Sequence, residues 1–192
     1  MLKYLATLIL PITFCLNAFS QDITDEAVLL PGPSEWRYER IAFPIDFAPE
    51  LDYNGYEELR FSPGMFKTYS DDFFSYAFAF KLDSISNFGQ GDLRELLNGY
   101  YSGLTKSMSK GRRRYDPNDI TVFVIKSPQE GRYTVKLNLV QYFTKRRRRL
   151  ALNLDVMTFT REGDTYVYAT ASPLPVGAPE RINLEKLISN DL

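Results

Sequence analysis

Two runs of basic residues are the strongest sign of chemistry in this sequence. Residues 106–150 carry 13 basic and 3 acidic side chains, whereas residues 21–105 carry 6 and 15. Arginine and lysine bind phosphate and carboxylate groups, and near an anionic membrane each contributes about 1 kcal/mol. If the two runs converge in the fold, they form an anion-binding patch; otherwise they pair with the acidic first half or are simply solvated. The candidate binding residues are Lys110, Arg112, Arg113, Arg114, Lys145, Arg146, Arg147, Arg148 and Arg149, with Lys106 beside the first run.

Paired carboxylates offer a second kind of chemistry. Two carboxyl groups about 5 to 9 Å apart can hydrolyse a glycosidic bond. The adjacent pairs here are Glu57-Glu58 and Asp71-Asp72. Neighbouring residues of a strand point to opposite faces, so Glu57 and Glu58 cannot form that dyad with each other. A Glu58–Asp71 or Glu57–Asp72 pair defines the alternative function, a carboxylate-dependent hydrolase acting on an envelope or extracellular glycan.

The residue types that are missing exclude several classes of reaction. The sequence has no histidine, and its one cysteine, Cys15, lies within the first 20 residues. Without histidine there is no Ser-His-Asp triad and no histidine-ligated metal site. No spaced Asp/Asn calcium loop, Gly-rich phosphate loop or Gly-x-Ser-x-Gly motif is present. We therefore favour a non-catalytic protein and assign no catalytic residue, no metal and no cofactor.

Residues 1–20 have the layout of a secretory signal peptide. Lys3 precedes an apolar run over residues 4–16, and small residues flank Phe19 before Gln21. We expect cleavage between Ser20 and Gln21, which removes Cys15 and places the mature chain in the periplasm or outside the cell. Lipidation of Cys15 and a retained N-terminal anchor are the alternatives. After cleavage, no transmembrane segment is expected.

The remaining sequence predicts a short lead-in and a single domain. Residues 21–34 are acidic and then rich in proline and glycine, which indicates a mobile lead-in, and residues 35–192 form one α+β domain. A helix is predicted over residues 92–110, and a short one is predicted near residue 183. Strands are predicted at residues 36–43, 56–62, 73–82, 120–126, 133–139, 150–156 and 165–171.

The clearest strand, residues 73–82, has large and small side chains on opposite faces. Phe74, Tyr76, Phe78, Phe80 and Leu82 share one face, and Ser75, Ala77 and Ala79 share the other. The large face is expected to fill a core, whereas the small face lets another segment approach closely. In the predicted helix Gly99 and Gly103 lie four residues apart, a spacing that also indicates close packing.

The predicted element order is β-β-β-α-β-β-β-β, in which strands and helices do not alternate. Short links between the last four strands indicate antiparallel pairing. We therefore expect an α+β fold in which one twisted antiparallel sheet of about seven strands packs on a single long helix.

Part of the first half resembles a group of known sequences. The resemblance lies in Phe-Ala-Pro at 47–49 and Gly-Tyr-Glu-Glu-Leu-Arg-Phe-Ser-Pro-Gly-Met-Phe at 55–66, and it extends over residues 36–80. This block resembles exported bacterial proteins that have no assigned activity. It implies an export-associated α+β domain, and no catalytic residue is carried over. The leading hypothesis is an exported binding domain whose partner lies in the envelope or outside the cell, with a polyanion as one class of partner and no specific nucleic acid.

Overall fold

The computed structural model describes residues 28–109, 115–142 and 148–188, and it contains a seven-stranded antiparallel sheet. The strand order across the sheet is β1-β2-β3-β7-β6-β5-β4, and the sheet is open and twisted. The predicted element order and fold class are therefore confirmed. The strands are β1 (Arg37–Ala42), β2 (Gly55–Phe61), β3 (Tyr76–Leu82), β4 (Thr121–Lys126), β5 (Arg132–Gln141), β6 (Arg148–Arg161) and β7 (Asp164–Ser172).

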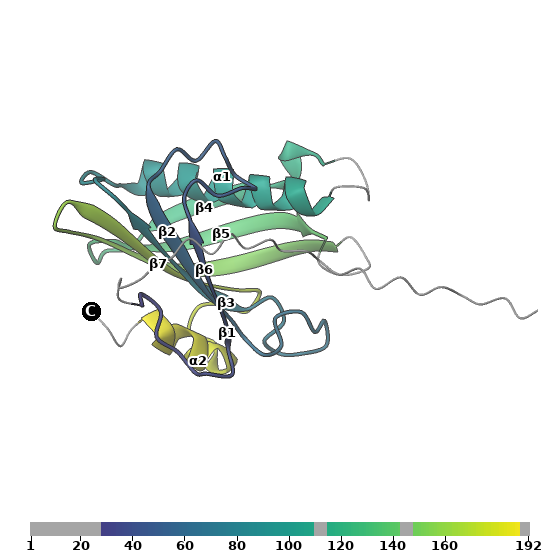
Figure 1. Ribbon diagram of the computed structural model, residues 1–192. Helices are drawn as coiled ribbons and strands as arrows, with labels where there is room; N and C mark the ends of the chain where they lie inside the picture. The colour runs from purple at the N-terminus through teal and green to yellow at the C-terminus, as the bar shows by residue number, and fades with distance from the viewer. Residues whose placement is uncertain (1–27, 110–114, 143–147, 189–192) are drawn as a thin grey trace, which may run out of the picture.

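Helices cover both faces of the sheet. The long helix α1 (Gln90–Ser109) lies on one face, and the short C-terminal helix α2 (Ile182–Glu185) lies on the other (Figure 1). Two 3-10 turns, η2 (Pro179–Arg181) and η3 (Lys186–Ile188), flank α2, and a third, η1 (Pro117–Asp119), precedes β4. In the described part of the chain, no helix is long and apolar enough to cross a membrane.

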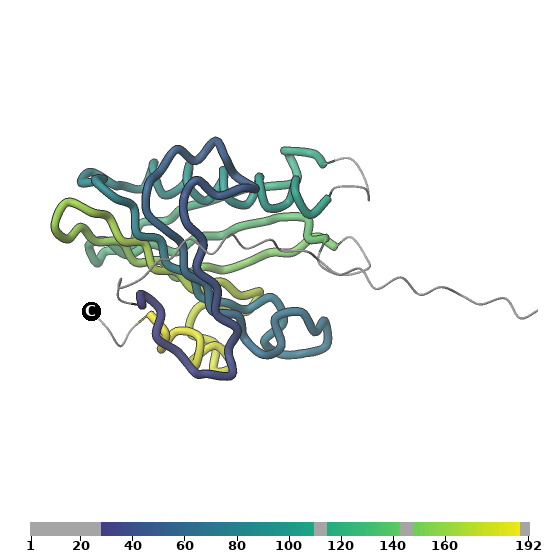
Figure 2. The backbone as a smooth tube through the Cα atoms, viewed as in Figure 1, coloured from purple at the N-terminus to yellow at the C-terminus, as the bar shows by residue number. Residues whose placement is uncertain are grey.

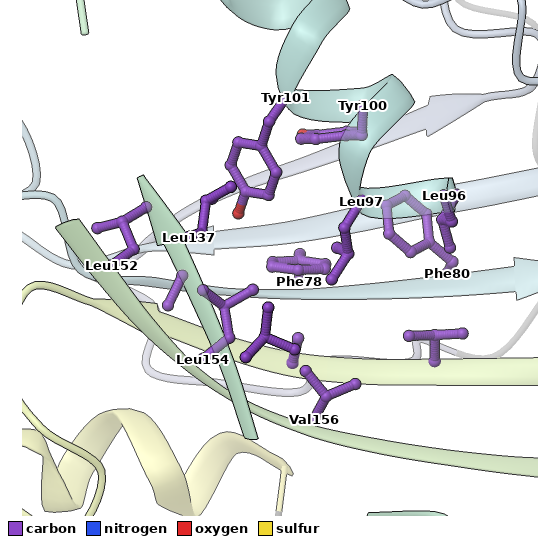
Figure 3. Close-up of a cluster of buried hydrophobic side chains, with 14 of the residues drawn as sticks. Phe78, Phe80, Leu96, Leu97, Tyr100, Tyr101, Leu137, Leu152, Leu154 and Val156 are labelled. Carbon is purple, nitrogen blue, oxygen red and sulfur yellow. The ribbon is translucent and has the colours of Figure 1, made fainter. Parts of the chain in front are cut away.

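The larger core lies between the sheet and α1. Phe78 and Phe80 of β3 point toward Leu97 and Tyr100 of α1, together with leucine and valine side chains of β5 and β6 (Figure 3). Phe78 and Tyr100 have nearly parallel rings whose centroids are 6.3 Å apart. The large face of β3 therefore fills a core, as its alternation predicts.

A smaller core lies on the opposite face of the sheet. Ala77 and Ala79 of β3 are fully buried there, and Leu184 and Leu187 of the C-terminal segment pack in the same cluster. The small side chains of β3 thus let the C-terminal segment lie directly on the sheet. The two faces of β3 therefore contact different elements, with α1 over the large side chains and the C-terminal segment over the small ones.

The glycines of α1 make room for the segment between β1 and β2. A Cβ atom on Gly103 would lie 2.2 Å from the backbone oxygen of Phe47, and one on Gly99 would lie 2.7 Å from the Leu51 side chain. Both positions therefore allow the approach that the spacing of the two glycines indicates. By contrast, a Cβ atom on Gly91, in the first turn of α1, would meet nothing within 4 Å.

Several predicted boundaries differ from the structure: β6, expected at residues 150–156, runs from Arg148 to Arg161, and the starts of β3 and α1 are shifted for a local reason. The strand expected from residue 73 begins at Tyr76. Phe74 lies in a turn with a φ of 55°, and its N–H donates to the carbonyl of Met65. The helix expected from residue 92 begins at Gln90. Asp92 is therefore inside the first turn, and its carboxylate accepts the Gly89 N–H at 2.8 Å. Both shifts arise from local hydrogen bonds that hydrophobic periodicity does not encode.

The two ends of the described chain are held against the smaller core. Leu29 and Leu30 of the lead-in are buried in this cluster, so packed structure begins before residue 35. Arg181 is only 1% exposed, and its guanidinium donates to the backbone oxygens of Asn153, Leu174 and Thr170. Charge-assisted hydrogen bonds of this kind fix the C-terminal segment in position.

Candidate functional site

The strand register brings the β2–β3 loop and the start of β6 to the same end of the sheet. Tyr76, the first residue of β3, pairs with Ala171, which in turn pairs with Leu154 of β6. β6 begins six residues before Leu154, so its first residue, Arg148, extends beyond the last row of the β3 ladder. The loop 62–75 leaves the sheet at this same end, because it joins β2 to β3.

The C-terminal end of α1 lies at this end as well. Figure 2 shows the end of α1, the described ends of β5 and β6, and the 62–75 loop on the same side of the molecule. Lys106 occupies the last turn of α1, and Arg148 and Arg149 begin β6. We call the surface made by these three side chains the basic end. The two sequence-separated basic runs thus have flanking residues at the same end of the fold.

Arg149 connects the start of β6 to the turn that follows α1. Its guanidinium Nη2 lies 3.2 Å from the Asp119 carboxylate of η1. The Arg149 side chain is 84% exposed, so this pair is well hydrated and contributes little to stability. The nearby Asp116 carboxylate accepts the Asn118 N–H at 2.9 Å and thereby caps η1. Arg149 therefore remains available to a solvent-borne anion.

The acidic first half has its own basic partners. Arg37 pairs with Glu39, Arg40 with Glu58, and Lys81 with both Asp83 and Asp164. By contrast, Lys106 and Arg148 are exposed, and they have no acidic partner among the described residues. Within the described chain, pairing with the acidic first half therefore does not neutralise the basic end.

The structure describes two of the predicted anion-binding residues. Arg148 and Arg149 are both exposed at the basic end. The others lie outside the described residues: Lys110, Arg112, Arg113, Arg114, Lys145, Arg146 and Arg147.

The geometry around Glu58 does not favour the carboxylate hydrolase. Glu58 is fully buried on the smaller-core face, where it accepts a hydrogen bond from Arg40 Nε at 3.0 Å and one from the Leu30 N–H at 2.9 Å. A glycan would have to displace the lead-in to reach it. Asp71, its proposed partner, is exposed in the 62–75 loop. These two carboxylates therefore have the environments of a structural ion pair and a solvated charge.

Glu57 points into the larger core on the opposite face, as the strand alternation predicts. Its carboxyl is fully buried, and neither oxygen has a hydrogen-bond partner among the described residues. Burial raises its pKa to about 8, because removal from water disfavours the charged form. The nearby Tyr100 hydroxyl lowers this pKa, and the negative charge of Glu39 raises it. With no described opening to solvent, Glu57 is a buried neutral acid rather than a general base.

Asp72, the other carboxylate considered for a dyad, organises the 62–75 loop. It accepts the Gly64 N–H at 2.8 Å and the Ser70 hydroxyl. Burial by itself raises the pKa of Asp72, but these hydrogen bonds, led by that of Ser70, lower it overall. A Cβ atom on Gly64 would lie 1.6 Å from the Asp72 carboxylate, so only glycine fits this turn.

Most of the aromatic residues in this region belong to the core, and two are exposed. Phe74 and Tyr76 are buried, whereas Tyr69 is 87% exposed and Phe66 is 49% exposed. Lys67 is also exposed and lies between them in the sequence. The 62–75 loop therefore presents two aromatic rings and a cation at the same end of the sheet as the basic end.

Two other kinds of candidate site, a metal site and a surface groove, have less support. In the described part of the chain, no group of three or more Cys, Asp or Glu side chains is placed to hold a metal ion. An open groove of about 580 Å³ lies between the lead-in and the C-terminal segment, and Trp36 and Lys186 are among its lining residues. Among the described residues, the buried polar atoms without a hydrogen-bond partner belong to Glu57 and Arg181, and neither residue lines this groove.

Comparisons with protein-family models, with curated proteins and with solved structures found no match to this chain.

Sequence reasoning did not single out Phe66 and Tyr69 as surface residues. The available signal was their context, because Pro63-Gly64 and Asp71-Asp72 enclose a segment that also contains Lys67 and Ser70. Turn residues and polar neighbours on both sides indicate an exposed loop.

Proposed function

We propose that this protein is an exported, non-catalytic binding domain that attaches to an anionic surface through its basic end. The observation that carries the proposal is the exposure of Lys106, Arg148 and Arg149 at one end of the fold. The sequence contains seven further basic residues within eight positions of Lys106 or Arg148, at 110, 112–114 and 145–147. A concentrated positive field of this kind attracts polyanions and accelerates their association.

The segregation of charge supports the same function. The first half and the last 42 residues are acidic, so the net charge of the whole chain is −1. Net charge therefore does not draw this protein to anions, and attraction depends on orientation. A protein that meets an anionic surface with its basic end is attracted, whereas the acidic remainder is repelled.

Export is part of the proposal and rests on the layout of residues 1–20. An envelope or extracellular location restricts the available anions to lipid headgroups, lipopolysaccharide and acidic glycans. The mass of the protein recovered from the host's envelope or medium tests this step. We expect a mature chain that begins at Gln21; a chain that retains Met1, or one cut at Cys15 and lipidated, would contradict it.

Removing the run of four arginines at 146–149 is expected to abolish tight anion binding. In the variant, Arg146, Arg147, Arg148 and Arg149 are replaced together by Gln, and its affinity is measured for heparin and for vesicles that contain phosphatidylglycerol. Because each basic residue near an anionic surface contributes about 1 kcal/mol, the affinity should fall by roughly 10²- to 10³-fold. Urea unfolding of the same variant establishes that it is folded.

A second variant with the same change in net charge serves as the control. It replaces four exposed basic residues outside the basic end, and these are Arg94, Lys126, Lys136 and Arg161. Distant exposed charges are screened at physiological salt, so its affinity should change by about threefold or less. Equal losses in the two variants would mean that total charge matters and the basic end does not.

A further inference from the structure

We propose that the anionic surface is the headgroup layer of a phospholipid membrane, into which Phe66 and Tyr69 insert beside the basic end. This inference rests on the proposed function and specifies its target. It assigns the protein as a peripheral membrane binder that combines charge attraction with two aromatic anchors.

The first argument is the exposure of the two rings. Tyr69 is 87% exposed and Phe66 is 49% exposed, although the same loop places Met65 and Phe74 in the core. The loop thus buries one set of apolar side chains, whereas Tyr69 and about half of Phe66, whose ring centroid lies 6.1 Å from that of Phe61, remain exposed. Large aromatic side chains left in water at a loop tip are typical of interaction surfaces.

The second argument is the fixed shape of the loop. Ser62 donates its hydroxyl to the Asp72 backbone oxygen at 3.0 Å, and the Phe74 N–H donates to the Met65 oxygen at 3.0 Å. The Asp72 carboxylate also accepts the Gly64 N–H across the loop. Because these bonds hold the loop from several sides, presenting the two rings to a partner requires little further ordering of the backbone.

The third argument is that the rings and the basic end face the same way. The register places the 62–75 loop and Arg148 beyond the same row of the sheet. β3 and β6 are separated by one strand, β7, so the strand axes lie about 10 Å apart at the row that contains Tyr76 and Leu154, and Arg148 lies about 20 Å further along β6. One flat surface that meets this end of the fold could contact both features together (Figure 1).

This combination distinguishes a membrane from a soluble polyanion. A sulfated glycan or a nucleic acid strand in solution is bound by charge, and an exposed phenylalanine adds little to that contact. A bilayer offers anionic headgroups and an apolar layer directly beneath them, where tyrosine and phenylalanine side chains are stable. Stable attachment to a membrane typically needs two signals, and this end of the fold supplies both.

The test compares vesicles with a soluble polyanion. In the double variant, Phe66 and Tyr69 are both replaced by Ser, and its affinity is measured for phosphatidylcholine vesicles with and without phosphatidylglycerol and for heparin. We expect the affinity for phosphatidylglycerol vesicles to fall about tenfold or more, because the apolar contact is lost. The affinity for heparin should stay within about twofold of the wild type, since charge alone sets it.

Replacement of Ile125 by Ser provides a matched control. Ile125 is 52% exposed, close to the value for Phe66, but it lies within the edge strand β4. This variant should bind both vesicles and heparin like the wild type. Urea midpoints of all variants, expected to change little at these exposed positions, separate lost binding from lost folding.

Two results would overturn the inference in distinguishable ways. If the Phe66/Tyr69 variant binds phosphatidylglycerol vesicles like the wild type while the four-arginine variant does not, the basic end binds anions but the membrane anchor is wrong. If the wild type binds heparin and not the vesicles, the partner is a soluble polyanion. If the wild type binds neither probe, the proposed function itself fails.

Discussion

Replacing Glu57 by Gln is expected to remove a pH-dependent loss of stability that amounts to several kcal/mol in the wild type. The pKa of Glu57 rises from an ordinary value of 4.5 to about 8 in the folded chain, chiefly through burial. Between these values the folded chain keeps a proton that the unfolded chain releases. The wild-type free energy of unfolding therefore falls as pH rises from 4.5 to 8, by about 3 kcal/mol at pH 7 and about 5 kcal/mol above pH 8.

The surroundings of Glu57 explain why no compensating charge is available. Tyr76 of β3 and Tyr100 and Tyr101 of α1 face it, and the hydroxyls of Tyr76 and Tyr101 bond each other at 2.6 Å. Burial raises the pKa of all three tyrosines, so they stay neutral. A nearby cation would stabilise the charged form of Glu57, but the charged group that acts on it is the carboxylate of Glu39, which disfavours that form.

Urea unfolding of the wild type and the Glu57→Gln variant across pH 4 to 9 measures this effect. The difference in unfolding free energy should be small near pH 4.5 and should grow by about 1.4 kcal/mol per pH unit up to pH 8. Other carboxyls contribute equally to both proteins and cancel in the difference. A difference that does not change with pH would show that Glu57 titrates alike in the folded and unfolded chains.

Replacing the neighbouring Glu58 by Gln is expected to destabilise the fold by about 3 kcal/mol at pH 7, the opposite of the change at Glu57. Both carboxyls are fully buried, but Glu58 accepts hydrogen bonds from Arg40 and from the Leu30 N–H. Burial alone lowers the pKa of Arg40, whereas bonding to Glu58 raises it overall. A neutral side chain at position 58 leaves the Arg40 cation without its partner and weakens the attachment of the lead-in.

The two single variants form a matched pair, because the substitution is the same and the positions are adjacent on β2. Unfolding midpoints in urea at pH 7 should shift in opposite directions, with Glu57→Gln above the wild type and Glu58→Gln below it. Limited proteolysis near Leu30 should also become faster only in the Glu58 variant. If both variants shift the same way, the contrast between an unpartnered and a partnered carboxyl does not hold.

Much of the fold follows from local sequence patterns. The alternation along β3 predicts both cores, because large and small residues there are segregated without exception between Tyr76 and Phe80. The spacing of Gly99 and Gly103 predicts a close approach to α1. The pattern does not reveal which segment approaches, because the segment between β1 and β2 is brought there by tertiary contacts.

The site is less accessible to sequence reasoning. Charge runs identify Arg148 and Arg149, but only the strand register shows that the 62–75 loop leaves the sheet beside them. Likewise, positions 57 and 58 are both glutamate, and the strand alternation predicts only that their side chains point to opposite faces of the sheet. Their environments depend on residues 18 or more positions away, Arg40 for Glu58 and Tyr100 for Glu57, so the difference between the two carboxyls is visible only in the structure.

The salt dependence of binding to phosphatidylglycerol vesicles tests the central claim most directly. The wild type and the variant with Gln at positions 146–149 are compared from about 0.01 M salt, where the Debye length is about 30 Å, to about 1 M, where it is about 3 Å. The account predicts that wild-type affinity falls by about two orders of magnitude or more over this range. The variant should bind weakly throughout, with a much shallower slope. Equal slopes for the two proteins, or wild-type affinity that does not respond to salt, would contradict the assignment of the basic end as an anion-binding surface.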